Sequence, residues 1–333
     1  MSSAVRAGKR GGRTRSAGEK MGKRLIGLCG PTASGKTAVS VALAARLDGE
    51  VISADSMQIY RGMDVLSAKP TAEETKGIRH HMIGVIDPKD SFNASRYREM
   101  AGALAEDAYR RGKTPILCGG TGLYIDALTK GMRMSEKADE RLRAELKAIA
   151  QTEGGPERLH ETLAALDPES AARYPAGDVR RVIRSIEIVR LTGLTRAEQE
   201  RIDALTPDDY DARLFALEWP RDELYRRIDA RVDEMLARGL INEVSKLIRE
   251  GTDAHPTAIQ AIGYKEIAAA LRGETAMSDA IARMKTASRN YAKRQITWFR
   301  RDPRVTWLAA PGKTAGELAD EIIARLRAEG SDM

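Results

Sequence analysis

The sequence LIGLCGPTASGKTAVSVALAARL, residues 25–47, decides the fold of this chain. It opens with an apolar run, residues 25–29, that has the length of a buried parallel strand. Residues 30–37 then match the pattern G-x-x-x-x-G-K-[S/T] at every fixed position, and apolar residues at helical spacing follow. A strand, a glycine-rich turn and a helix in this order predict a phosphate-binding loop, because backbone N–H groups and a helix N-terminus face one anion.

Each residue type in this loop has a role in holding phosphate. Gly30 and Gly35 let the backbone approach the anion closely, Lys36 neutralises its charge, and the Thr37 hydroxyl is placed to bind Mg²⁺. We therefore expect a polyphosphate to be bound by the whole loop: Gly30, Pro31, Thr32, Ala33, Ser34, Gly35, Lys36 and Thr37. The flanking strand and helix argue against a chance match in a glycine-rich segment.

The composition limits the protein class. A chain of 333 residues is long enough for two domains, or for one domain with a large insertion. No apolar run could span a membrane and the mean hydropathy is −0.42, so we expect a cytoplasmic protein without a membrane partner. The two cysteines, Cys29 and Cys118, lie in apolar runs and are expected to be reduced. Four scattered histidines and no C-x-x-C pair do not favour a zinc site.

The net charge of +7 is unevenly distributed. Residues 1–24 carry a net +7 and residues 283–304 carry another +7, so the remainder of the chain carries −7. Residues 1–22 lack apolar periodicity, and we interpret them as a disordered basic tail that is either solvated or in contact with RNA. The positive charge of the folded part is therefore concentrated near its C-terminal end.

Strands and helices alternate through much of the chain. Five further apolar runs have the length of strands: 51–54, 82–86, 114–118, 214–217 and 305–308. Helical spacing is found at 95–111, which Ser95 could cap, at 223–238, and after the Gly119-Gly120-Thr121-Gly122 turn. This alternation predicts a parallel α/β sheet flanked by helices, whose ligands bind beyond the carboxyl ends of the strands.

The pattern changes in the middle of the chain, where helical stretches rich in Arg, Glu and Ala replace the strands. We expect a P-loop α/β core with C-terminal helices in residues 23–132 and 212–310. A small all-helical insertion is expected at 133–211, and a C-terminal helix and tail at 311–333.

Two polar residues follow strands next to the phosphate loop. Asp55 comes after the run 51–54 and Thr121 comes after the run 114–118, so both are expected at the same edge of the sheet. A carboxylate at Asp55 suits a general base or hydrogen-bond acceptor on a nucleophile. The structural alternative is an Asx-turn or a helix cap for residues 56–60.

Basic residues and aromatic rings are interleaved near the C-terminal end. Between residues 289 and 300, four Lys or Arg side chains alternate with one Tyr, one Trp and one Phe. This pattern is typical of RNA binding, although a solvated helix face with core rings has the same composition. A smaller arginine group at 180–184 has the same two interpretations.

Five motifs in order combine these features: GPTASGKT at 30–37, DSMQIYRGMD at 55–64, GGTGLY at 119–124, AIGYKE at 261–266 and KRQITWFR at 293–300. Together they resemble the bacterial tRNA dimethylallyltransferases, also called tRNA isopentenyltransferases, over about residues 24–308. The resemblance implies a P-loop nucleotide-kinase-like fold with a helical insertion that grips the anticodon stem. It also implies transfer of a dimethylallyl group from dimethylallyl diphosphate to N6 of the adenosine at position 37 of tRNA, next to the anticodon, with release of diphosphate.

The resemblance implies catalytic roles for Asp55, Lys36 and Thr121, with Asp55 as the base on N6. The diphosphate would lie in residues 30–37, with Mg²⁺ as the cofactor at Thr37. The implied partners are dimethylallyl diphosphate and the anticodon stem-loop of tRNA, and we expect a monomer. The implied tRNA contacts are Asp55, Ser56, Met57, Gln58, Thr121, Arg143, Arg180, Arg181, Arg184, Gln260, Gly263, Tyr264, Lys265, Lys293, Arg294, Gln295, Trp298 and Arg300.

Two other functions use the same phosphate loop. One is an ATP-binding nucleoside or nucleotide kinase, and the other is a non-catalytic RNA-binding ATPase. The sequence has no guanine-reading N-K-x-D, and the run 114–118 ends in Gly-Gly-Thr instead of the acidic residue usual in hydrolytic ATPases. Reactions with dimethylallyl diphosphate, with ATP and with tRNA distinguish the three functions.

Overall fold

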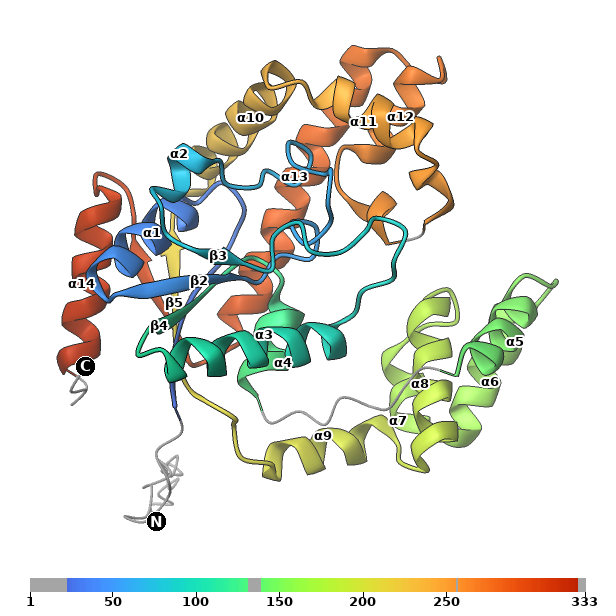
Figure 1. Ribbon diagram of the computed structural model, residues 1–333. Helices are drawn as coiled ribbons and strands as arrows, with labels where there is room; N and C mark the ends of the chain where they lie inside the picture. The colour runs from blue at the N-terminus through green and yellow to red at the C-terminus, as the bar shows by residue number, and fades with distance from the viewer. Residues whose placement is uncertain (1–22, 131–138, 256, 329–333) are drawn as a thin grey trace, which may run out of the picture.

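The computed structural model describes residues 23–130, 139–255 and 257–328, and its centre is a six-stranded parallel sheet (Figure 1). The strands are β1 (Arg24–Cys29), β2 (Gly49–Ser53), β3 (His80–His81), β4 (Thr114–Cys118), β5 (Asp211–Glu218) and β6 (Val305–Ala309). Their order across the sheet is β3-β2-β4-β1-β5-β6. Leu28 of β1 is in register with Cys118 on one side and Phe215 on the other, so β1 is central and the predicted parallel sheet is confirmed.

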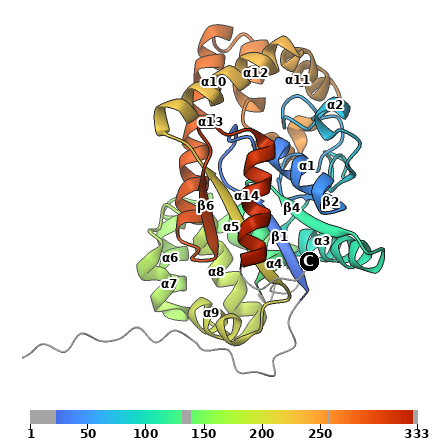
Figure 2. The same cartoon turned by 90° about the vertical axis from the view of Figure 1, so that its left-hand side faces the viewer.

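Helices cover both faces of the sheet. On one face lie α1 (Lys36–Arg46) and α14 (Ala315–Ala328), which Figure 2 shows in front of the strands. The other face packs against α3 (Ala94–Arg110), α4 (Gly122–Thr129) and the end of α13 (Met277–Arg300). In β1, Ile26 and Leu28 belong to the first layer, while Leu25 and Cys29 belong to the second. Burial on both faces explains why the β1 sequence is a continuous apolar run.

The third predicted strand is wrong in position. The structure has β3 at His80–His81, and residues 82–86 contribute only an isolated bridge between Tyr60 and Ile86. Met82 and Gly84 have φ angles of 61° and 62°, in the left-handed region, and this conformation interrupts an extended run.

The expected cap of α3 is also corrected. The Asn93 side chain, not Ser95, accepts the hydrogen bond from the Arg96 N–H.

A group of helices follows β5 and lies beyond the carboxyl ends of the strands. It comprises α10 (Arg221–Ala237), α11 (Leu240–Arg249), η1 (Thr252–Ala254), η2 (Ala258–Gln260), α12 (Tyr264–Leu271) and the beginning of α13. A short helix, α2 (Ala72–Thr75), precedes β3. Val232, Val244, Ile267 and Met284 of these helices share one apolar cluster with the sheet, so α13 connects the group to the core.

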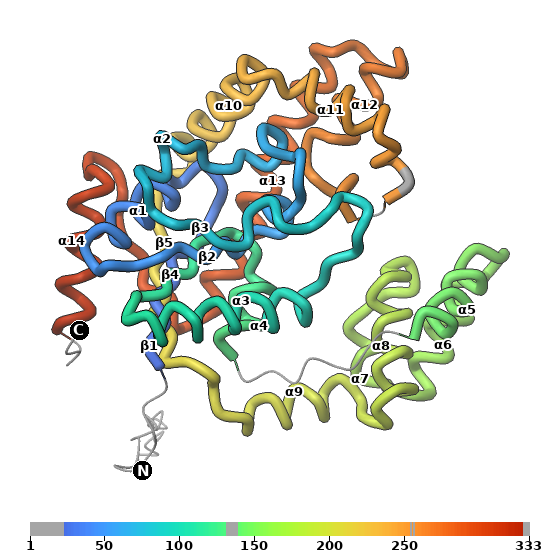
Figure 3. Tube along the Cα trace, in the orientation of Figure 1, coloured from blue at the N-terminus to red at the C-terminus, as the bar shows by residue number. Residues whose placement is uncertain are grey.

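Among the described residues between α4 and β5 there are five helices: α5 (Glu140–Ala150), α6 (Gly155–Leu166), α7 (Pro168–Arg173), α8 (Val179–Thr192) and α9 (Arg196–Leu205). Leu146, Leu159, Leu163, Val182 and Ile186 make an apolar cluster of their own. Figure 3 shows α5–α8 set apart from the sheet, with the chain returning through α9 to β5. The predicted boundary near residue 133 and the basic tail at 1–22 lie outside the described residues.

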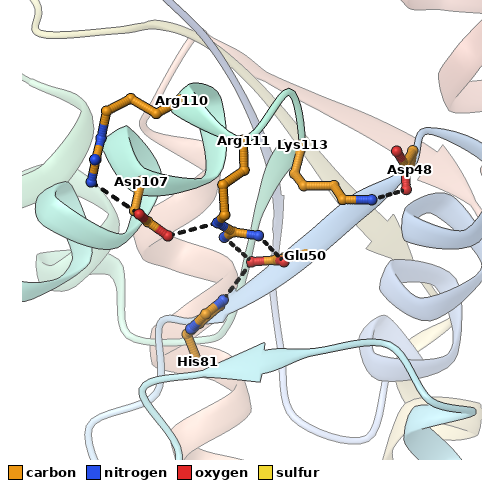
Figure 4. Close-up of polar contacts among 7 residues, drawn as sticks. All are labelled: Asp48, Glu50, His81, Asp107, Arg110, Arg111 and Lys113. Carbon is orange, nitrogen blue, oxygen red and sulfur yellow. Dashed lines mark hydrogen bonds and ion pairs between the residues drawn. The ribbon is translucent and has the colours of Figure 1, made fainter.

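Ion pairs connect the amino ends of β2 and β4, opposite the edge where ligands of such sheets bind (Figure 4). Both carboxylate oxygens of Glu50 accept hydrogen bonds from Arg111 at 2.6 Å, and His81 Nε2 lies 2.8 Å from Glu50 Oε2. This arrangement holds the pKa of Glu50 down at about 2, chiefly because Arg111 hydrogen-bonds to the carboxylate. Among the described residues, no helix has the length and apolar character needed to cross a membrane.

Candidate active site

The phosphate loop connects the end of β1 to the start of α1, as the sequence predicts. Gly30 and Gly35 have φ angles of 115° and 96°, which only glycine adopts without strain, and these angles bend the backbone at both ends of the loop. Lys36 is the first residue of α1, and the first N–H groups of a helix have no partner within it. The loop therefore offers backbone donors, a helix N-terminus and an ammonium group to one anion.

Side chains from the β5–α10 junction hold the carbonyl oxygens of the loop. Trp219 Nε1 donates to the Ser34 carbonyl oxygen at 2.9 Å, and Arg227 Nε donates to the Ala33 carbonyl oxygen at 2.9 Å. The Arg227 guanidinium also lies 4.1 Å from the centre of the Trp219 ring. These contacts fix the loop from outside, so its conformation does not depend on a bound ligand.

Sequence reasoning missed Trp219 and Arg227 as parts of this site. The available signal was weak. It consisted of a Trp-Pro pair at a strand end, followed by arginines spaced four residues apart on α10.

Lys36 carries a charge that burial disfavours. Its Nζ donates to the Pro31 carbonyl oxygen at 2.5 Å. Burial lowers the pKa of Lys36 from its ordinary value of 10.5 to about 8, with Arg231 acting in the same direction and Cys118 and Asp55 opposing it. An anion in the loop would favour the charged form again, so Lys36 is suited to binding a polyphosphate.

Asp55 lies immediately beyond β2, and one of its two carboxylate oxygens forms a turn. Its Oδ1 accepts hydrogen bonds from the N–H groups of Met57 at 2.9 Å and Gln58 at 3.4 Å, which is the Asx-turn. No hydrogen bond is recorded for Oδ2 within the described part of the chain. Asp55 acts electrostatically on Lys36 and on Arg231, so it faces the phosphate loop. One oxygen is thus fixed by the turn, and the other is available to a ligand.

Thr121 lies beside Asp55, as expected for two strand ends of a parallel sheet. Its hydroxyl accepts a hydrogen bond from the Ser56 N–H at 3.0 Å, and its own N–H donates to the Ala54 carbonyl oxygen at 3.0 Å. Gly119 allows this close approach, since a Cβ there would lie 2.2 Å from the Ala54 carbonyl oxygen. The loop after β2 and the turn after β4 are therefore held together at this edge of the sheet.

Charged side chains hold the loop after Asp55 through hydrogen bonds and an ion pair. Glu243 of α11 accepts hydrogen bonds from three consecutive N–H groups, those of residues 64–66, at 2.8 to 2.9 Å. The buried Lys69 ammonium pairs with Asp64 at 2.6 Å and also donates to the Tyr60 carbonyl oxygen. Sequence reasoning missed Glu243 and Lys69, because both act on backbone groups that only the folded chain brings near.

Helix α13 closes the site on the side of Thr121. Gln295 is buried and pairs with backbone groups of both the phosphate loop and the Gly119–Thr121 turn. The Tyr291 hydroxyl lies beside Thr121 and Gln295, and burial together with the nearby Asp55 raises the pKa of Tyr291 to about 12. Trp298 is 45% exposed, and its Nε1 donates to Asp126 Oδ2 at 3.2 Å. In the sequence, Tyr291 is only one of three aromatic residues interleaved with basic residues.

The basic residues expected to contact tRNA fall into two groups. Arg180, Lys265, Lys293 and Arg294 are exposed, and no ion pair is recorded for them among the described residues. Arg181 pairs with Asp178 and Arg300 with Glu218, but both remain more than half exposed. Gln260 is exposed at the end of η2.

Arg143 and Arg184 are partly exposed and pair with a buried carboxylate inside the insertion. Arg143 binds both oxygens of Glu187, at 2.6 and 3.0 Å, and Arg184 reaches the same carboxylate at 3.2 Å. The Glu187 side chain is only 1% exposed, so these arginines neutralise a buried charge. Direct tRNA contact is therefore not needed to explain either arginine.

Three further residues expected at the tRNA are buried in the structure. Tyr264 is 1% exposed and its hydroxyl bonds to Asp253 Oδ1 at 2.9 Å, which places it in the core. Gly263 is buried against Met284, where a Cβ would lie 2.8 Å from the methionine side chain. Gln295 is also internal. Motifs do not distinguish such buried residues from their exposed neighbours.

Comparison with known proteins gives one family. The family model described as IPP transferase matches residues 58–302. A tRNA dimethylallyltransferase of Halalkalibacterium halodurans is 46% identical over 288 residues, which cover 86% of this chain and 91% of that protein. A tRNA dimethylallyltransferase of Geobacter metallireducens is 44% identical over 290 residues, covering 87% of this chain and 94% of that protein.

Solved structures agree with the sequence comparison. The crystal structure of a tRNA delta(2)-isopentenylpyrophosphate transferase from Staphylococcus epidermidis matches with a TM-score of 0.68 at 39% identity, covering 92% of this chain and 99% of that one. A eukaryotic dimethylallyltransferase described as acting on tRNA matches with a TM-score of 0.79 at 29% identity, covering 93% of this chain and 81% of that one.

Proposed function

The chain belongs to the IPP transferase family as a tRNA dimethylallyltransferase that prenylates the adenosine next to the anticodon, and we propose how its own residues perform this reaction. The observation that carries the proposal is the position of Asp55. A carboxylate with one unengaged oxygen faces a phosphate loop that contains Lys36. The loop holds the leaving group of the donor, and the carboxylate holds the amine of the acceptor.

The donor binds through its diphosphate. As the bond between the allylic carbon and the diphosphate oxygen breaks, negative charge accumulates on the diphosphate. The N–H groups of the loop and the Lys36 ammonium stabilise that charge where it develops. Because Trp219 and Arg227 fix the loop beforehand, little reorganisation is required during the reaction.

The acceptor is the exocyclic N6 of the adenosine, whose lone pair is delocalised into the ring. Asp55 Oδ2 accepts a hydrogen bond and then the proton from N6 as the new carbon–nitrogen bond forms. Met57 and Gln58 keep Asp55 in the required orientation through Oδ1, and Thr121 holds the neighbouring Ser56. The adenosine must leave its stack to reach this site, at a cost of a few kcal/mol that contacts in the site offset.

Mg²⁺ fits the oxygen atoms that the site offers. The Thr37 hydroxyl, in the first turn of α1, forms no hydrogen bond within the described part of the chain, so its oxygen is open to the cation. This hydroxyl together with phosphate oxygens of the donor suits Mg²⁺, which keeps several waters. No group of three or more His, Cys, Asp or Glu suited to a metal is found among the described residues. Bound there, Mg²⁺ would neutralise part of the diphosphate charge.

The tRNA is proposed to contact the exposed cations on α8, α12 and α13, including Arg180, Lys265, Lys293 and Arg294. Contacts with phosphates position the anticodon stem-loop, while the residues around Asp55 receive the adenosine. In this account the helical insertion grips the anticodon stem. The protein acts as a cytoplasmic monomer.

The test is nucleoside mass spectrometry on tRNA incubated with the protein, Mg²⁺ and either dimethylallyl diphosphate or ATP. We expect one dimethylallyl group on the adenosine next to the anticodon, with one diphosphate released per transfer. Unmodified tRNA together with phosphate transfer from ATP to a small acceptor would support a kinase instead. Hydrolysis of ATP stimulated by RNA without any transfer would support the RNA-binding ATPase.

A further inference from the structure

Gln295 connects two parts of the active site from inside helix α13. Its Oε1 accepts a hydrogen bond from the Thr32 N–H of the phosphate loop at 2.9 Å, and its Nε2 donates to the Gly120 carbonyl oxygen at 2.9 Å. The side chain is 4% exposed, although its neighbours Lys293 and Arg294 are exposed on the same helix. A buried amide that pairs at both ends defines the separation of the two loops.

The position of this amide leaves no room for a side chain at Gly120. A Cβ at Gly120 would lie 2.0 Å from Gln295 Nε2 and 3.2 Å from the Gly30 carbonyl oxygen. The turn before Thr121, the phosphate loop and the Gln295 amide are thus in mutual contact. None of the three can shift without moving another.

We propose that Gln295 is a positioning residue that sets the phosphate loop relative to Thr121 and couples tRNA binding on α13 to donor binding. The coupling follows from the two faces of one helix. Lys293 and Arg294 project from the exposed face, whereas Gln295 holds the donor loop from the buried face. Contacts made by tRNA with the exposed face therefore restrain the helix that restrains the donor loop. The coupling to tRNA rests on the proposed function.

The test compares Gln295→Met, which keeps the length of the side chain but loses both hydrogen bonds, with Ser278→Ala, an exposed position in the first turn of α13 that is remote from Lys293 and Arg294. Calorimetry gives the affinities for inorganic diphosphate and for dimethylallyl diphosphate, each with and without tRNA. For Gln295→Met we expect donor affinity to fall about tenfold and the strengthening of donor binding by tRNA to fall at least about fivefold. The affinity of Gln295→Met for tRNA alone should stay within about twofold of wild type, and Ser278→Ala should change none of these affinities.

A second pair of variants approaches the same contact from the other side. In Gly120→Ala the new Cβ collides with the Gln295 amide, so the donor defect should appear although Gln295 is intact. In the double variant Gly120→Ala with Gln295→Ala, the shortened side chain makes room for the Cβ. The two defects should therefore not add.

Two results would overturn the proposal. One is an unchanged diphosphate affinity in Gln295→Met. The other is a parallel loss of diphosphate affinity, tRNA affinity and melting temperature, which would indicate a role in folding alone. If wild type bound diphosphate but transferred nothing to tRNA, the proposed function would fail. The diphosphate affinities would still decide the role of Gln295 in the loop.

Discussion

Lys36 is the residue whose charge state depends most on the donor. In the free protein burial and the nearby Arg231 disfavour its ammonium, and the carboxylate of Asp55 only partly compensates. The lowered pKa means that the site holds a charge at neutral pH at some cost to stability. A bound diphosphate removes that cost, so affinity for the anion is built into the free site.

This predicts a pH dependence of donor binding. With the Lys36 pKa at about 8, the ammonium is mostly present below that pH and is lost as the pH rises above it. Binding an anion favours the protonated form, so diphosphate affinity should fall by up to about tenfold per pH unit above pH 8. Calorimetric titration with diphosphate measures the effect. Lys36→Arg should bind diphosphate more weakly but should not lose affinity as the pH rises above 8. The same loss of affinity in that variant would mean that another group titrates.

The residues proposed to act on the substrates can largely be predicted from the sequence, but the residues that hold them in place cannot. The phosphate loop, Asp55 and Thr121 follow from a motif and from the rule that parallel strand ends meet at one edge. Glu243 and Trp219 act on backbone atoms far away in the sequence, so no local pattern reveals them. The sequence also leaves open whether Asp55 forms a turn or serves a ligand. The structure assigns one oxygen to the turn.

At the scale of elements, charge runs on helices have different roles on different faces. On α8, Arg180 is exposed, whereas Arg184 turns inward to Glu187 together with Arg143 of α5. The sequence predicts the helix and its arginines, but not which of them meets a buried carboxylate. The prediction of a strand at residues 82–86 fails for a similar reason. An apolar run does not reveal that Met82 and Gly84 adopt left-handed conformations.

This difference predicts separate effects for two arginines of the insertion. Arg180→Ala should weaken tRNA binding and reduce the dependence of log affinity on log salt by about one unit, with an unchanged melting temperature. Arg143→Ala should lower the melting temperature, because Glu187 loses its two-point partner in the interior. Binding across a salt series and thermal unfolding of both variants are the measurements. Equal salt slopes in wild type and Arg180→Ala would place the RNA elsewhere.

At the scale of the molecule, stability and function lie at opposite ends of the sheet. The carboxyl ends of the strands carry the site, while Glu50, Arg111 and His81 join β2, α3 and β3 at the amino ends. A network of this kind strengthens an edge strand of only two residues without limiting the loops at the other end.

The Glu50 network predicts a loss of stability in acid. The pKa of Glu50 is about 2 in the folded state, below its ordinary value of 4.5. The contribution of Glu50 to the free energy of unfolding is therefore complete above about pH 4.5 and is lost as the pH falls toward 2. Glu50→Gln should therefore unfold about 3 kcal/mol more easily at pH 7, with a weaker loss of stability in acid. The matched control is Asp48→Asn, since Asp48 pairs with Lys113 but is 77% exposed and should change little. Denaturant unfolding at several pH values tests both, and equal effects of the two variants would contradict this assignment.

The central claim is that the phosphate loop holds the leaving group while Asp55 takes the proton from the adenosine. Single-turnover transfer by Asp55→Asn, measured together with diphosphate affinity on the same protein, tests it most directly. We expect the rate to fall by about 10²-fold or more while diphosphate affinity stays close to wild type. The amide still accepts from the Met57 and Gln58 N–H groups through its oxygen, so the turn is retained. Transfer at the wild-type rate would contradict the claim and leave Asp55 as a turn residue only.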